Sequence, residues 1–214
     1  MTKTTRTYHH GDLRNALMDT ALAHIEAARE VSFTLRELAG ALGVSSAAPF
    51  RHFPSKRALL AALAEAGFAR LAARYDELDA AFGADPVDCF RRKGVAYVQF
   101  AVSHQAYFLT MYHPDLGDKS EFPALKAAYD RVFSSMRTTV AACREKNLLR
   151  DFDVGQITLT AWSTVHGLAS LLIQGQLDDL GTDATDEAAT RAAEAVTMIT
   201  GIGFLKPGRA ASKK

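Results

Sequence analysis

Apolar residues recur three or four positions apart along most of this 214-residue chain, the spacing that places side chains on one face of an α-helix. The period is visible in a short stretch around Leu35 and Leu38 and in a long one from Leu59 to Leu78. No stretch alternates apolar and polar residues as a half-buried β-strand does. The pattern therefore predicts an all-α fold of about nine helices, with a small N-terminal three-helix domain and a larger C-terminal helical bundle.

Residues that cap helices mark where the predicted helices begin. Thr34 and Glu37 have the spacing of a capping box, in which each side chain accepts a hydrogen bond from a backbone N–H of the first turn. Further N-caps are expected at Asp12, Ser45, Ser55, Asp85, Asp153 and Thr185. The helices are expected over residues 12–28, 34–42, 46–52, 55–82, 87–104, 105–112, 121–147, 153–177 and 185–204.

The second and third predicted helices have the spacing of a helix-turn-helix. Gly43, just past the last apolar residue of the second helix, can adopt the left-handed conformation that closes a helix. Ser45 then caps the third helix, over 46–52, so the turn has the length of this motif. Pro49 is tolerated near the start of that helix, where at most one backbone hydrogen bond is lost. The small side chains at 46–48 allow this candidate recognition helix to approach a groove closely.

Three short runs at fixed spacing fall within this region: Gly43-Val44-Ser45, Phe50-Arg51-His52-Phe53 and Ser55-Lys56-Arg57-Ala58-Leu59-Leu60. Together they resemble the DNA-binding domain of TetR-family transcriptional regulators, and the resemblance extends back to about Tyr8. It implies that double-stranded DNA is the partner, with bases and phosphates contacted around the third helix. The predicted DNA-binding residues are Thr34, Arg36, Ser45, Ser46, Ala47, Ala48, Phe50, Arg51, His52 and Lys56.

Within this set, Arg51 and residues 46–48 are expected to face bases, while Thr34, His52, Lys56 and Tyr8 are expected to hold phosphates. Lys56 lies beside a helix N-terminus, whose free N–H groups suit a phosphate. One position departs from the family: Phe50 stands where a Tyr is usual, and the Tyr hydroxyl commonly reaches a phosphate. Losing one neutral hydrogen bond of about 0.5–1.5 kcal/mol weakens DNA binding without abolishing it.

The distribution of charged residues agrees with an N-terminal DNA-binding domain. Residues 1–57 carry eight Lys and Arg against five Asp and Glu, whereas the remainder carries 17 against 19. The basic excess therefore lies on the part expected to contact DNA. We expect two domains. Residues 1–57 form the N-terminal arm and helix-turn-helix, and residues 58–214 form the ligand-binding and dimerisation domain. The long helix 55–82 links them.

Several classes of protein are disfavoured. Cys89 and Cys143 are far apart and form no CxxC motif, which argues against a disulfide framework and against a metal site. No apolar run approaches the ~20 residues of a membrane span, and the N-terminus is polar, so we expect a cytoplasmic protein without membrane contact. No HExxH, GxSxG, P-loop or dinucleotide-binding glycine pattern occurs, so neither catalysis nor a cofactor is expected.

Aromatic residues gather in the C-terminal half and predict a small-molecule site with apolar walls and a few polar tips. The alternative is that these side chains simply fill the core. The predicted ligand-binding residues are Phe100, His104, Tyr107, Phe108, Met111, Phe133, Met136, Trp162 and His166.

Trp162 and His166 lie four positions apart on one helix face, and Gly167 follows the histidine. This combination resembles the C-terminal domain type named after Trp, His and Gly within TetR-like regulators. Two roles for His166 stay open: a polar group that binds the ligand, or a histidine that a core neighbour satisfies.

Small residues at helical spacing on the last two long helices allow close helix packing. The family resemblance implies that helices 153–177 and 185–204 build a homodimer as a four-helix bundle. The sequence thus predicts a homodimeric repressor that a small apolar or aromatic effector releases from its DNA operator. The alternative is a ligand-independent DNA-binding activator or architectural protein.

Overall fold

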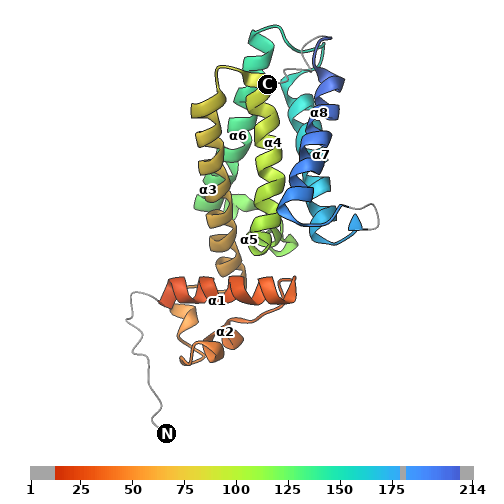
Figure 1. Cartoon of the computed structure of the whole chain (residues 1–214). Helices are drawn as coiled ribbons and strands as arrows, with labels where there is room; N and C mark the ends of the chain where they lie inside the picture. The colour runs from red at the N-terminus through yellow and green to blue at the C-terminus, as the bar shows by residue number, and fades with distance from the viewer. Residues whose placement is uncertain (1–12, 179–181, 208–214) are drawn as a thin grey trace. The chain divides into compact units, whose positions relative to one another are not determined.

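The computed structural model describes residues 13–178 and 182–207. Within these ranges the chain forms eight α-helices and no strand, apart from one isolated antiparallel bridge between Leu149 and Leu205 (Figure 1). The predicted cap Asp12 and the predicted phosphate contact Tyr8 lie outside the described residues. The helices are α1 (Leu13–Ala28), α2 (Leu35–Ala41), α3 (Lys56–Phe82), α4 (Pro86–Ser103), α5 (Gln105–Met111), α6 (Pro123–Glu145), α7 (Val154–Ile173) and α8 (Asp186–Phe204).

Five of the predicted caps are present, at Thr34, Ser55, Asp85, Asp153 and Thr185. The predicted cap Ser45 is not one of them, because the 3-10 helix that follows it has Ala48 at its N-cap and no side-chain cap. The Thr34 hydroxyl accepts a hydrogen bond from the Glu37 N–H at 3.2 Å, and the Glu37 carboxylate accepts one from the Thr34 N–H at 2.7 Å. Asp153 and Gln156 form a second capping box at the start of α7. Gly43 has a φ of 67°, the left-handed conformation expected after α2.

The third predicted helix, over residues 46–52, is the one that the structure does not show as an α-helix. Residues 46–52 form no α-helix but a turn followed by a 3-10 helix, η1 (Pro49–Arg51). Pro49 has no N–H to donate to the Ser45 carbonyl, which instead accepts from the Ala48 N–H at 2.9 Å. The predicted count of about nine helices is therefore close: eight are α-helices and the remaining one is this 3-10 turn.

Two loops that follow long helices begin earlier than predicted. The helix expected to reach residue 147 ends at Glu145, and Asn147 has a positive φ of 55°. The helix expected to reach residue 177 ends at Ile173, two residues before Gly175 at a φ of 66°. Two further 3-10 turns, η2 (Pro114–Leu116) and η3 (Lys119–Glu121), precede α6, which begins at Pro123 and not at the predicted residue 121.

The chain forms two compact units. The N-terminal unit comprises the described residues up to Gly67 together with Ala106–Leu125, and the C-terminal unit comprises Phe68–Gln105 and the described residues from Lys126 onward. The predicted division at residue 57 lies in the first turn of α3 and stays a prediction. In the N-terminal unit, α1 and α2 pack around Leu17, Ile25 and Leu38, all of which are buried.

In the C-terminal unit, α4 contacts both α7 and α8, and α7 contacts α8, so these three helices lie side by side (Figure 1). Val98 and Ala101 of α4 and Val165 of α7 are buried. None of the described helices combines the length and the apolar character needed to cross a bilayer.

Candidate nucleic-acid interface and ligand site

The turn around η1 presents side chains from a firmly held backbone. Pro49 and Phe53 are buried beneath it, and the guanidinium carbon of Arg14 on α1 lies 5.1 Å from the centroid of the Phe53 ring. Between these anchors, Phe50 is 46% exposed and Arg51 is exposed. A large apolar ring and an arginine therefore face solvent next to each other.

The predicted DNA-binding residues all belong to the N-terminal unit. Seven are exposed: Thr34, Arg36, Ser45, Ser46, Ala47, Phe50 and Arg51. Ala48, His52 and Lys56 are half-buried. The Lys56 ammonium donates to the Val31 carbonyl at 3.0 Å and lies 5.1 Å from the centroid of the Phe33 ring. An ammonium has three donors, so this contact leaves donors for a phosphate.

Arg57 makes a set of contacts that sequence reasoning missed. Its two terminal nitrogens donate to the two carboxylate oxygens of Glu121 at 2.6 and 2.8 Å. Its Nε and Nη2 also donate to the carbonyls of Asp115 and Leu116 at 3.0 and 2.7 Å. The mutual hydrogen bonds raise the pKa of Arg57 and lower that of Glu121. Nothing in the sequence pairs these two residues, which lie 64 positions apart.

The predicted ligand-binding residues are divided between the two units. Tyr107, Phe108 and Met111 belong to the N-terminal unit, and the other six belong to the C-terminal unit. Met111 has no exposed surface, and a Cβ placed on Gly67 would lie 2.8 Å from its sulfur. Helices α3 and α5 thus approach closely at this glycine. In the C-terminal unit, Phe100 stacks on His104 with ring centroids 5.0 Å apart.

His166 joins a continuous row of aromatic rings within the C-terminal unit. Its Nδ1 and the Tyr97 hydroxyl are 2.8 Å apart, and its ring centroid is 5.3 Å from that of Trp162. The Trp162 ring is in turn 5.2 Å from that of Phe133. Burial lowers the pKa of His166 and favours the neutral imidazole. A hydrogen bond between His166 and a core neighbour is thus observed, while its contact with a ligand stays a prediction.

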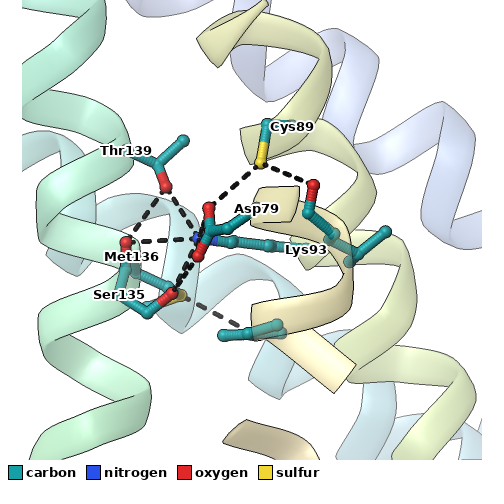
Figure 2. Close-up of polar contacts among 8 residues, drawn as sticks. Asp79, Cys89, Lys93, Ser135, Met136 and Thr139 are labelled. Atoms are coloured by element: carbon teal, nitrogen blue, oxygen red, sulfur yellow. Dashed lines mark hydrogen bonds and ion pairs between the residues drawn. The ribbon is translucent and has the colours of Figure 1, made fainter. Parts of the chain in front are cut away.

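A buried charged network joins α3, α4 and α6 (Figure 2). Lys93 has no exposed surface, and its ammonium lies 2.7 and 2.8 Å from the two carboxylate oxygens of Asp79. The same ammonium donates to the hydroxyls of Ser135 and Thr139, each at 2.7 Å. Partial burial alone would raise the pKa of Asp79, but the hydrogen bond and the charge of Lys93 lower it below its ordinary value.

The sequence contains a signal for this network. Lys93 lies four residues after Cys89 and four before Tyr97, both of which are buried, so it shares their helix face. A lysine on the buried face of a helix needs an internal partner. The identity of that partner could not be derived from spacing, because Asp79 and Ser135 lie on other helices.

A cavity of about 350 Å³ lies in the C-terminal unit between α4, α6, α7 and α8. Its walls are mainly apolar and include Phe90, Val165 and Phe204. Met136 lines it too, and is the one member of the predicted ligand set that does. The position of this cavity was not predicted from the sequence.

Helices α7 and α8 also expose large apolar side chains. Leu159 is 61% exposed, Ile199 is 64% exposed and Ile202 is 50% exposed, and Leu171 and Met198 are exposed as well. Such a group of exposed apolar side chains on two adjacent helices is typical of a surface that another protein chain covers.

Two family models match the sequence. The model of the bacterial regulatory proteins of the tetR family matches residues 25–63, which include α2, η1 and the start of α3. The model of the tetracyclin repressor-like C-terminal domain matches residues 90–196, half of the chain. No curated protein matches the sequence.

Solved structures share the fold over nearly the whole chain. A protein of unknown function from Rhodococcus sp. RHA1 is 32% identical, with a TM-score of 0.71 over 90% of this chain and 97% of that one. The TetR family transcriptional regulator PfmR from Thermus thermophilus is 22% identical, with a TM-score of 0.66 over 93% and 96%. The ketosteroid transcriptional regulator KstR2 of Mycobacterium tuberculosis is 18% identical, with a TM-score of 0.67 over 91% and 95%.

Proposed function

The chain belongs to the TetR family of transcriptional regulators, and from this premise we propose that it is a homodimeric repressor that a small apolar or aromatic ligand releases from its DNA operator. DNA-binding regulation is common to the family. Dimerisation, repression and release by a ligand are the parts that we propose for this chain. We also propose that it acts in the cytoplasm and has no catalytic role.

The observation that carries the DNA-binding proposal is the exposed turn around η1. Phe50 and Arg51 are exposed there, while Pro49 and Phe53 hold the backbone from beneath. An exposed arginine on a turn that buried side chains anchor suits base contacts, because a guanidinium can donate two hydrogen bonds to one guanine. Thr34, His52 and Lys56 flank the turn and would contact phosphates, which position the protein without reading sequence.

Exposed apolar residues on α7 and α8 support the dimer. Leu159 and Ile199 are both more than half exposed. In a twofold dimer the same face of each chain meets its copy, so α7 and α8 of both chains would form a four-helix bundle. We propose that helices 153–177 and 185–204 form the interface between the two chains, as the sequence predicts.

A cavity in the C-terminal unit supports regulation by a ligand. A ligand-independent activator or architectural protein would need no cavity, so the volume of about 350 Å³ favours the ligand-responsive alternative. A ligand shifts the equilibrium between a DNA-binding state and a released state only as far as its affinities for the two states differ.

Binding to DNA tests the proposal most directly. We would measure fluorescence anisotropy with tiled duplexes from the DNA that flanks the gene, at about 0.15 M salt and with scrambled competitor DNA. We expect one duplex to bind tightly and to resist the competitor. Binding that is equally weak and salt-sensitive for every duplex would contradict a sequence-specific repressor of neighbouring genes.

Two variants separate base contacts from phosphate contacts. Arg51→Ala should weaken binding to the specific duplex and leave the weak binding to scrambled DNA unchanged. Lys56→Ala should weaken binding to all duplexes and reduce the salt slope by about one. Arg74→Ala is the matched control, because Arg74 is exposed on α3 in the C-terminal unit and pairs with Glu77.

A further inference from the structure

We propose that Phe50 determines part of the DNA sequence that this protein selects, by contacting the 5-methyl group of one thymine in each half-site of the operator. The inference deepens the proposed function and rests on it, because it names a base that the turn around η1 recognises. The sequence predicts contact between Phe50 and DNA without identifying the chemical group that the ring meets.

Phe50 is an exposed apolar side chain that the proposed dimer does not explain. Seven large apolar residues are exposed in the described part of the chain. Six of them belong to the C-terminal unit: Phe152, Leu159, Leu171, Met198, Ile199 and Ile202. Five of these six lie on α7 or α8, where the proposed dimer would cover them. Phe50 belongs to the N-terminal unit, among the predicted DNA-binding residues, so its exposure points to DNA.

The backbone around Phe50 is held by hydrogen bonds inside its own turn. The N–H of Arg51 donates to the Ala48 carbonyl at 3.2 Å. The N–H of Phe53 donates to the Pro49 carbonyl at 2.9 Å. Pro49 and Phe53 are buried, whereas Phe50 is 46% exposed. An anchored backbone therefore carries a ring that solvent, and hence a DNA groove, can reach.

The neighbours of Phe50 leave room for the edge of a base. Ser46 and Ala47 are exposed and Ala48 is half-buried, and all three side chains are small. The major groove, about 12 Å wide, admits such a turn. Phe50 is the largest apolar side chain among residues 46–52, so its ring provides most of the apolar surface that this turn can offer to a base.

The chemistry of a phenyl ring limits its partners on DNA. The ring has no N–H or O–H group, so it cannot donate a hydrogen bond to a phosphate. Covering a phosphate with the ring would remove water from a charge without a compensating hydrogen bond. The apolar group that thymine presents in the major groove is its 5-methyl group, and Phe is among the side chains that contact it. The ring therefore favours thymine over cytosine, which has no methyl group.

Arg51 offers a contact of the opposite kind beside this ring. Its guanidinium is exposed and carries only hydrogen-bond donors, which suit the two acceptors of a guanine. Phe50 and Arg51 would thus recognise different chemical groups of the same half-site. Because one contact is apolar and the other is polar, the methyl group can be removed from the DNA while the contact of Arg51 is kept.

The test first isolates the preferred DNA from a pool of random duplexes, so that it does not depend on where the operator lies. Each thymine of the selected duplex is then replaced singly by uracil, which pairs with adenine in the same way and lacks only the 5-methyl group. Fluorescence anisotropy at one fixed salt concentration measures each affinity, because binding to DNA depends on salt. Burial of one methyl-sized group changes an affinity about fourfold, so we expect one thymine in each half-site whose replacement weakens binding by that factor.

Phe50→Ala connects this methyl group to the ring. The variant should bind the thymine and the uracil duplex with equal affinity, because the contact is absent from both complexes. Since Phe50 is exposed, its removal leaves the buried core unchanged. Arg51→Ala is the matched control: it should bind both duplexes more weakly but keep the difference of about fourfold between them.

A second comparison adds the methyl group to another base. At the same position, a cytosine–guanine pair with a 5-methyl group on the cytosine differs from the unmethylated pair only in that group. We expect the unmodified protein to bind the methylated duplex about fourfold more tightly than the unmethylated one. Phe50→Ala should bind the two duplexes equally.

Two results would overturn the inference and leave the proposed function intact. The first is equal affinity for thymine and uracil at every position of the selected duplex. The second is a preference for thymine that Phe50→Ala retains, which would assign the methyl contact to another side chain. Failure of the proposed function has a different sign: no sequence is enriched from the random pool, and that result contradicts this inference as well.

Discussion

Lys93 is a charged residue with no exposed surface, and Asp79 is its carboxylate partner. Asp79→Asn keeps a similar shape but leaves the ammonium without an opposite charge. Removing one partner of a fully buried pair costs about 3–5 kcal/mol. Because the Asp79 side chain is 42% exposed and solvent screens it, we expect a smaller loss in the free energy of unfolding, about 2 kcal/mol.

Urea unfolding at pH 7 measures this loss, and Asp76→Asn is the matched control. Asp76 lies on the same helix and pairs with Arg131, but both side chains are about half exposed. Exposed pairs contribute about 0–1 kcal/mol, so the control should lose little. If Asp79→Asn and Asp76→Asn lose the same unfolding free energy, the burial of Lys93 has no energetic consequence.

The same pair makes stability depend on pH. The pKa of Asp79 is lowered in the folded protein, whereas an unfolded Asp titrates near ~3.9. A lowered folded pKa stabilises the protein above the unfolded pKa, and this contribution is lost as the pH falls through the folded pKa. The difference in unfolding free energy between the unmodified protein and Asp79→Asn should therefore have its largest value above about pH 5 and decrease below about pH 4. A difference that grows on acidification would contradict the direction of this pKa shift.

Arg57 connects two elements that are distant in sequence, the first turn of α3 and the segment 113–122. A lysine cannot form the paired bonds to Glu121 and the two carbonyl bonds together, because it has a single nitrogen. In Arg57→Lys we expect amide hydrogens of residues 113–122 to exchange at least tenfold faster. Mass spectrometry measures this exchange, and α7 in the same sample is the reference that should not change.

A control variant for this experiment is Arg74→Lys, because the pair that Arg74 forms with Glu77 is exposed and local. The Arg74→Lys variant should not change the rate of amide hydrogen exchange in residues 113–122. If Arg57→Lys behaves like this control, the contacts of Arg57 do not hold the segment.

At the level of elements, the sequence predicted best where the cause is local. Thr34 with Glu37, the N-cap Asp153, and Gly43 act within one turn, and each has the predicted geometry. The one predicted helix that is not an α-helix contains Pro49, whose missing N–H changes the hydrogen bonding of its own turn. The cause of that difference is also local, because Pro49 cannot donate to the Ser45 carbonyl and the turn closes through the Ala48 N–H.

Features that depend on other helices could not be predicted in this way. Lys93 meets its partner Asp79 across a helix interface, and no spacing along the chain encodes that contact. The cavity similarly arises where Gly94 lets three helices converge, so the aromatic composition of the sequence could not locate it. The predicted DNA-binding and ligand-binding residues stay predictions until binding is measured.

At the scale of the whole molecule, the proposed dimer depends on the apolar face of α7 and α8. Ile199 is 64% exposed, and Ile199→Arg would place a charge in the proposed interface. We expect sedimentation at micromolar concentration to show a dimer for the unmodified protein and a monomer for Ile199→Arg. Phe50→Ser is the control, because it removes an exposed apolar ring from the N-terminal unit and should leave the dimer intact.

Dimerisation should also determine how tightly the protein binds DNA. A twofold dimer places two recognition turns on two half-sites, so the second contact forms at a high effective concentration. Ile199 lies on α8 in the C-terminal unit, outside the predicted DNA-binding residues, so Ile199→Arg alters DNA affinity only through assembly. We expect its affinity for a full operator to fall by about 100-fold or more, while its affinity for a single half-site stays unchanged. A monomeric Ile199→Arg protein that binds the full operator as tightly as the unmodified chain would show that one recognition turn suffices, and the proposed dimer would then have no part in DNA recognition.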